Sequence, residues 1–264
     1  MQLSRISRMV LAAITILTLL YIYMPIAVVG INSFSPSISM AWPPSGFTLE
    51  WWGKAFVSEG AMQALGTSVV VALAASAIAL VLGTLLSFAI ARFKFFGQQA
   101  LNLMVVLPIA LPGIVTGLAL NNLFKSVLAW QLGMLTLIIA HATFTVVVIF
   151  NNVVARLRRQ GGNLEEASSD LGADLFTTFR LITFPRIKSA LFAGGLLAFA
   201  LSFDEIIVTT FTAGGGVTTL PIFILNNMYR PNQAPIVAVI AIVVTILSLI
   251  PIYLAERITS RDET

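Results

Sequence analysis

The chain has 264 residues, of which 58% are hydrophobic and only 10% are charged, with a net charge of +4. Soluble domains carry about 25% charged residues, so this composition excludes a water-soluble domain and predicts an all-α protein that crosses a membrane several times. The chain has no cysteine, which excludes disulfides and thiolate metal sites.

Six apolar segments approach or exceed the roughly 20 residues that a helix needs to cross a bilayer. In chain order they cover about residues 9–31, 63–91, 99–124, 132–155, 189–212 and 234–255. The first is longer than the apolar core of a signal peptide and ends without a small-residue cleavage site, so we expect it to be retained. No soluble domain is left over, and residues 1–264 are predicted to form a single transmembrane domain.

The basic residues are distributed unevenly between these segments. With a cytoplasmic N-terminus, the outer side holds three of the fifteen Lys and Arg residues: Lys54, Lys125 and Arg230. The other twelve lie on the cytoplasmic side: Arg5, Arg8, Arg92, Lys94, Arg156, Arg158, Arg159, Arg180, Arg186, Lys188, Arg257 and Arg261. Because basic residues collect in cytoplasmic loops, both termini and the polar segment 156–188 are predicted to be cytoplasmic. Topology therefore explains the net charge without nucleic acid as a partner, and most of these charges need no further role.

Two longer loops are predicted on the outer face. The first, residues 32–62, contains Trp42, Trp51 and Trp52, which suit the membrane interface, and the alternative is a docking surface for an extracytoplasmic partner. In the second loop, residues 220–229 are apolar but too short to span, which indicates a short re-entrant helix.

The third apolar segment contains helix-breaking residues. Pro108 and Pro112 remove backbone donors four residues apart and predict a kink. Gly113 and Gly117 allow close approach of another helix. The bend is either a hinge that lines a cavity or a static kink.

The polar segment 156–188 is expected to contain two short helices. Residues 164–172 have acids in the first turns and Gly172 as a C-terminal stop. Residues 173–182 are predicted to form a second helix. It should end near Phe184 and Pro185, because the residue before a proline is disfavoured in a helix. Such a pair would form a knob parallel to the membrane, and four apolar side chains could enter a pocket of a partner: Leu171, Leu175, Phe176 and Phe179. An ordinary amphipathic surface hairpin is the alternative.

This segment resembles the inner-membrane permeases of bacterial ABC importers, which carry the cytoplasmic pattern E-A-A-x3-G-x9-I-x-L-P. Five of its seven defined positions match at the family's spacing: Glu166, Ala167, Gly172, Ile182 and Pro185. Ser168 replaces the second alanine and Phe184 replaces leucine. The resemblance implies a coupling helix that docks in a groove of an ATP-binding subunit, with these residues as the coupling set: Glu166, Ala167, Ser168, Asp170, Gly172, Ile182 and Pro185.

Other segments narrow the resemblance to spermidine/putrescine-type permeases, and within them to the second of two permease subunits. These segments are Asn32-Ser33-Phe34, Gly46-Phe47-Thr48 and residues 201–205 leading to Leu220-Pro221. This subfamily also serves opines, phosphonates and other small amino compounds. The resemblance implies the type I importer fold with six transmembrane helices in the bacterial inner membrane. Its partners would be an ATP-binding cassette ATPase dimer, a second permease subunit and an extracytoplasmic solute-binding protein.

The chain itself is predicted to be non-catalytic. It lacks the G-x-x-x-x-G-K-[ST] loop that binds nucleotide phosphates, so ATP and Mg²⁺ would be used by the partner subunit and no cofactor is expected here. His141 is the single histidine, and it is expected to be a hydrogen-bonded packing residue rather than a metal ligand. A secondary carrier or channel that works without ATP is the alternative, but the cytoplasmic helical segment favours the ABC importer.

Two acids lie in the fifth apolar segment. A carboxylate at bilayer depth costs on the order of 2.5–3.5 kcal/mol, so Asp204 and Glu205 are functional candidates. Four polar residues recur at helical spacing and predict a polar stripe on one face: Ser202, Glu205, Thr209 and Thr212. We hypothesise that this stripe lines a water-filled path in which Glu205, with Asp204 nearby, attracts cationic amines. The alternative is a structural pair bonded across helices or to the backbone.

Overall fold

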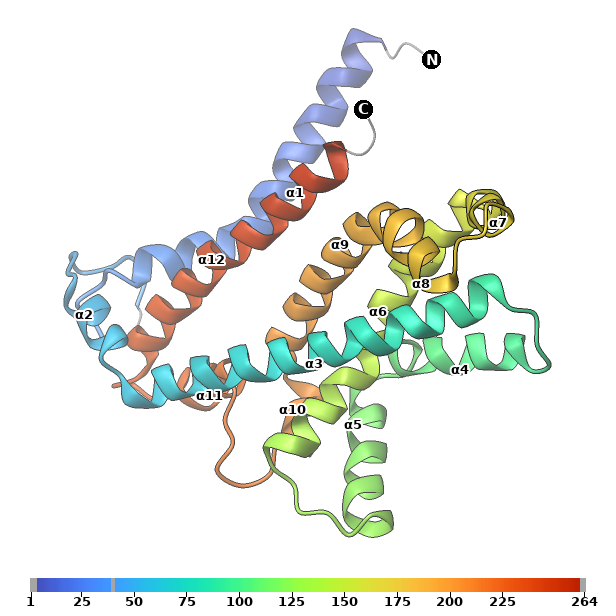
Figure 1. Cartoon of the computed structure of the whole chain (residues 1–264). Helices are drawn as coiled ribbons and strands as arrows, with labels where there is room; N and C mark the ends of the chain where they lie inside the picture. Colours follow the sequence, from blue (N-terminus) through green and yellow to red (C-terminus); the bar gives the residue numbers. More distant parts are fainter. Residues whose placement is uncertain (1–3, 39–40, 262–264) are drawn as a thin grey trace. The chain divides into compact units, whose positions relative to one another are not determined.

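The computed structural model describes the backbone of residues 4–38 and 41–261 and the side chains as far as Ser248 (Figure 1). Every regular element in these ranges is helical, which confirms the predicted all-α class. The chain divides into two compact units. The first comprises the described parts of Met1–Met62 and Ile224–Leu247, and the second comprises Gln63–Phe223 and the described residues after Leu247.

The first unit contains α1 (Arg5–Asn32), α2 (Glu50–Phe56) and the first half of α12 (Ala234–Arg261). Ser4 caps α1 by accepting the N–H of Ser7 at 3.1 Å. Large apolar side chains are exposed along the length of α1, as expected for a helix that faces lipid or another membrane chain. In the following loop, Trp52 stacks on Phe34 with 5.1 Å between ring centroids, so this tryptophan packs within the loop.

Three long helices form the core of the second unit. They are α3 (Glu59–Arg92), α6 (Met134–Gln160) and the continuous run of α8 (Leu175–Thr178), the π-helical turn η2 (Phe179–Thr183) and α9 (Phe184–Phe203). Each is long and apolar enough to cross a membrane. Their core consists of buried residues from all three helices: Ala79, Ile149, Val153, Leu157, Ile187 and Ala198. We refer to α3, α6 and α9 below as the core helices.

The third predicted span is not one continuous helix. It consists of α4 (Gln98–Ala110) and α5 (Gly113–Asn122), extended by the π-helical turn η1 (Leu123–Val127), and the two parts are bent by 107°. The bend follows from Pro112, which has no N–H to continue the helical ladder and holds Leu111 extended. Gly117 allows close approach as predicted, because a Cβ there would lie 2.6 Å from Phe211 Cδ2.

The fifth predicted span is also interrupted. α9 ends at Phe203 and α10 (Ile207–Thr212) begins after a break at residues 204–206, where the sequence predicted an unbroken helix. The short apolar segment at 220–229 forms α11 (Leu220–Asn227), and the N–H of Leu220 donates to Ser68 Oγ at 2.8 Å.

By length and composition alone, fewer than six helices of the described chain qualify as membrane spans. Four helices of the described chain qualify: α1, α3, α6 and the run from α8 to α9. The bent pair of α4 and α5 makes a fifth if it counts as one span, and α12 contributes a shorter apolar stretch, Ala234–Ser248.

Gly83 lets α3 and α6 approach closely. A Cβ at this position would lie 2.8 Å from Ile149 Cβ and 2.9 Å from Val146 O. We expect Gly83→Ala to lower the free energy of unfolding by about 1–3 kcal/mol through overpacking, measured as a lower Tm of the detergent-purified chain. Gly66→Ala on the same helix is the matched control, because a Cβ there meets nothing within 4 Å. Equal losses in the two variants would contradict this account.

Candidate functional site

The polar segment between α6 and α9 begins with α7 (Asn163–Asp170), which ends in a tight glycine turn. The N–H of Gly172 donates to Ser169 O at 2.9 Å, and that of Ala173 donates to Ser168 O at 3.1 Å. Together these bonds make a Schellman motif. Gly172 has φ +84°, and a Cβ there would meet nothing within 4 Å, so the left-handed backbone alone favours glycine. The structure thus has the C-terminal stop that the sequence predicted.

The second helical piece differs from the prediction at its end. Asp174 caps α8 by accepting the N–H of Thr177 at 2.8 Å, and hydrogen bonds from the side chain and backbone of Thr177 lower the pKa of Asp174. The helix does not end near Phe184 and Pro185 but runs through η2 into α9. The N–H of Phe184 reaches back five residues to Phe179 O, and the next residue, Pro185, has no N–H to leave unpaired.

α7 has an inner and an outer face. Ser168, which replaces the second alanine of the motif, is buried, and its Oγ lies 2.9 Å from Thr178 Oγ1. Glu165 is half-buried. The other six residues of the helix are exposed: Asn163, Leu164, Glu166, Ala167, Ser169 and Asp170. The coupling set predicted from the motif is therefore divided, with Ser168 packed inside the segment and the remaining α7 members on the outside.

The tip of the segment is apolar and exposed. Leu171, Leu175 and Phe176 are 89%, 87% and 68% exposed. Phe179, predicted to belong with them, instead packs against Phe88 at 5.8 Å between ring centroids. Exposed apolar side chains grouped in this way are typical of a surface that binds a partner. The two remaining motif positions, Ile182 in η2 and Pro185 in α9, lie at the base of the segment and not at its tip.

Two arginines that sequence reasoning assigned only to topology, Arg156 and Arg92, make contacts at the two ends of this segment. Arg156 Nε and Gln160 Nε2, both on α6, donate to Arg186 O of α9 at 3.1 and 3.0 Å and so join the two core helices that flank it. Arg92, at the end of α3, forms an ion pair with Glu165. Residues 73 positions apart have no shared local pattern, so no signal in one sequence could have shown this pair.

The three hydroxyl residues of the predicted polar stripe on the fifth span are buried, and Glu205 is half-buried. His141 Nδ1 lies 2.8 Å from Ser202 Oγ, and His141 Nε2 lies 2.9 Å from Thr209 Oγ1. Thr212 is buried too, and its carbonyl accepts from Thr136 Oγ1 at 2.9 Å. These hydroxyls bond within the described chain and do not line a water-filled path there. The histidine has the hydrogen-bonded packing role that was expected of it.

The two acids of the break have different surroundings. Glu205 Oε1 accepts the N–H of Val208 at 2.8 Å and so caps the first turn of α10. Asp204 follows the last residue of α9 and is exposed, and its carboxylate has no hydrogen-bond or ion-pair partner among the described residues. The break therefore offers one bonded and one free carboxylate.

The sequence and the fold both match known transport proteins. Residues 79–261 match the family described as binding-protein-dependent transport system inner membrane component. The chain is 33% identical over 254 residues to the putrescine transport system permease protein PotI of Escherichia coli K12, covering 92% of this chain and 90% of that protein. It is 32% identical over 245 residues to the spermidine/putrescine transport system permease protein PotC of the same strain, covering 92% and 91%.

A solved structure has the same fold. It is the crystal structure of a bacterial ABC transporter involved in the import of the acidic polysaccharide alginate, which matches with a TM-score of 0.73 over 100% of both chains at 14% identity.

These matches confirm the family that the cytoplasmic motif predicted. They favour a non-catalytic membrane subunit of an importer over a secondary carrier or channel. The chain belongs to the family of inner membrane components of binding-protein-dependent transport systems.

Proposed function

We propose that this permease imports polyamines or related small amines and that α7 couples it to a separate ATPase dimer. The observation that carries the coupling is the division of the polar segment into two faces. Its inner side is bonded through Glu165 to Arg92 of α3, while its outer side presents Glu166, Asp170 and the apolar tip. A docked partner would therefore push on a rigid element.

The proposed orientation rests on charge. Twelve basic residues against three favour cytoplasmic termini and place residues 156–188 on the side that holds ATP. Six crossings keep both termini on one side, which requires the bent pair of α4 and α5, the broken α9 and α10, and α12 each to count as one crossing. ATP and Mg²⁺ would act in the partner, with no cofactor in this chain.

Two further partners complete the proposed assembly. The family description names a binding protein, which would deliver substrate from outside. A second permease subunit would share the transport cavity, and the exposed apolar length of α1 is available to it and to lipid. ATP binding would close the ATPase dimer, move the segment 156–188 and open the cavity outward, and hydrolysis would reset it.

Gly172 gives a test of the coupling. A side chain at a left-handed position costs roughly 1–2 kcal/mol, so Gly172→Ala would reorient Leu171 and the apolar tip. We expect it to weaken ATPase binding to the nanodisc-embedded permease roughly five- to thirtyfold, measured by surface plasmon resonance. Gly172→Asn should lose less, since asparagine tolerates this backbone conformation. Gly66→Ala is the control, and undiminished binding by Gly172→Ala would show that α7 is not the docking element.

The helix break supports a cationic substrate. The backbone carbonyls at the end of α9 carry partial negative charge, and the Asp204 carboxylate adds a full one at the same place. An acid is unfavourable at a helix C-terminus, whereas Glu205 stands favourably at the start of α10. Asp204 is therefore the better candidate to attract an amine, with Glu205 as its support. Both relatives named above are called putrescine permeases, which fits a substrate with two positive charges.

Asp204→Asn tests this pathway. One carboxylate about 4 Å from a cation contributes about 1 kcal/mol in water and about 4 kcal/mol near a protein surface, so we expect labelled putrescine uptake to fall at least about fivefold. Glu205→Gln should lose less, because an amide oxygen can still accept from Val208. Thr210→Val, whose exposed hydroxyl bonds only back to Ile206 O at 2.8 Å, is the matched control.

Two results would separate the parts of this proposal. Normal uptake by Asp204→Asn in an assembled complex would remove the carboxylate from the pathway. A wild-type complex that carries a phosphonate or an opine and no polyamine would overturn the substrate class and leave the coupling intact.

A further inference from the structure

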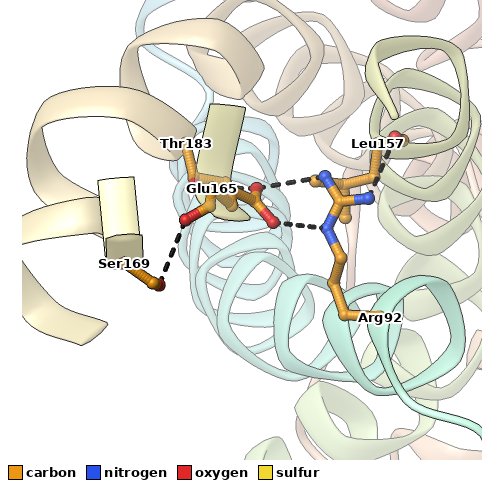
Figure 2. Close-up of polar contacts among 5 residues, drawn as sticks. All are labelled: Arg92, Leu157, Glu165, Ser169 and Thr183. Carbon is orange, nitrogen blue, oxygen red and sulfur yellow. Dashed lines mark hydrogen bonds and ion pairs between the residues drawn. The ribbon is translucent and has the colours of Figure 1, made fainter. Parts of the chain in front are cut away.

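A shielded ion pair joins α7 to α3 (Figure 2). Arg92 is the last residue of α3, and Glu165 lies in the first turn of α7. Arg92 Nε lies 2.7 Å from Glu165 Oε2, and Arg92 Nη2 donates to Glu165 Oε1 at 3.0 Å. The guanidinium thus contacts both carboxylate oxygens, one through a hydrogen bond from Nη2 and the other through the close ion-pair approach of Nε.

Both partners also bind a further element. Arg92 Nη1 donates to Leu157 O near the end of α6 at 3.5 Å. Glu165 Oε1 accepts from Thr183 Oγ1 at 2.9 Å, and Thr183 is the residue directly before α9. As Figure 2 shows, the pair thus connects α7 with α3, with α6 and with Thr183 in the turn η2 that leads into α9.

Solvent competes little for this contact. The side chains of Arg92 and Glu165 are 19% and 24% exposed, whereas those of the pair Lys54 and Glu50 on α2 are 49% and 60% exposed. Exposed ion pairs contribute little because water and salt screen them, while shielding strengthens the attraction. The contact between Arg92 and Glu165 is therefore suited to hold two elements together under load.

Glu165 and Glu166 point in different directions from α7. Successive residues on a helix diverge by about 100°, so Glu165 turns toward Arg92 while Glu166 is exposed. The hydrogen bonds of Ser168 to Thr178 and of Ser169 to Glu165 O stay within the segment. Glu165 is thus the α7 side chain whose bonds reach α3.

We propose that the Arg92–Glu165 ion pair is the positioning contact that makes α7 and α3 move as one body, so that a push on α7 reaches the transmembrane helices. This inference rests on the proposed coupling of α7 to an ATPase. Glu165 lies outside the E-A-A pattern, and the pair acts by transmitting motion, without contact to nucleotide or substrate.

The test uses the complete transporter in proteoliposomes, with labelled putrescine uptake and ATP hydrolysis measured on the same sample. Arg92→Ala and Glu165→Ala should each lower the putrescine transported per ATP hydrolysed at least about fivefold. The double variant should be no worse than the worse single variant, since both lose the same contact. Lys94→Ala is the matched control, because it removes the same charge from an exposed position two residues away.

The ratio distinguishes transmission from stability. A merely structural role would reduce the amount of assembled complex and lower uptake and hydrolysis alike, leaving the ratio unchanged, and that result would overturn the inference.

A covalent link gives a second test, since the chain has no cysteine. Arg92→Cys with Glu165→Cys should be uncoupled like the alanine pair. Joining the two thiols with a short bismaleimide should restore the wild-type ratio, in a complex whose other subunits present no accessible thiol. A linked variant that stays uncoupled would contradict the inference.

Different results are expected if the proposed coupling of α7 to an ATPase is wrong. Gly172→Ala would then bind the ATPase normally, or the wild-type complex would show no ATP-dependent uptake. A coupled wild type with equally coupled Arg92→Ala and Glu165→Ala variants would remove only the role of the ion pair.

Discussion

A backbone at membrane depth must satisfy its own hydrogen bonds, because hydrocarbon offers none. The second unit of this chain departs from continuous α-helix at several places, and each departure is managed locally. The break at residues 204–206 is bridged by two side chains: Glu205 Oε1 accepts from Val208 N, and Thr209 Oγ1 donates to Glu205 O. A break that is bonded in this way is a stable feature that can present a carboxylate.

The rigidity of the rest of this unit depends on α6. It packs against Gly83 of α3 and Gly194 of α9, where a Cβ would lie 2.8 and 3.2 Å from side-chain atoms of Ile149. Its C-terminal end supplies the donors Arg156 and Gln160 to the backbone of α9. Displacement of the polar segment would therefore meet closely packed helices that transmit it, as closely packed interiors do.

The sequence predicted what depends on local pattern. The long apolar helices follow from composition, and the glycine stop of α7 follows from a motif whose spacing lies within one short segment. Pro112 predicted a kink but not its angle. The 107° bend between α4 and α5 also depends on the packing of α5 against Phe211. No proline or glycine lies at the break after Phe203, so the sequence did not predict it. The burial of Ser202 and Thr209 depends on His141, about sixty residues away, which a single sequence cannot show.

Two pairs of adjacent acids, one in α7 and one at the break after α9, each combine a bonded and an exposed carboxylate. In each pair one carboxylate is bonded, Glu165 to Arg92 and Glu205 to the N–H of Val208. The other, Glu166 or Asp204, is exposed. In α7 the turn of about 100° between neighbours separates the two acids, and Asp204 and Glu205 are separated by the break between α9 and α10. Because the bonded neighbour holds the backbone in place, the free carboxylate keeps its position without an internal partner of its own. Glu166 and Asp204 are thus exposed beside a bonded neighbour, which is the arrangement that the proposed docking and cation-attracting roles require.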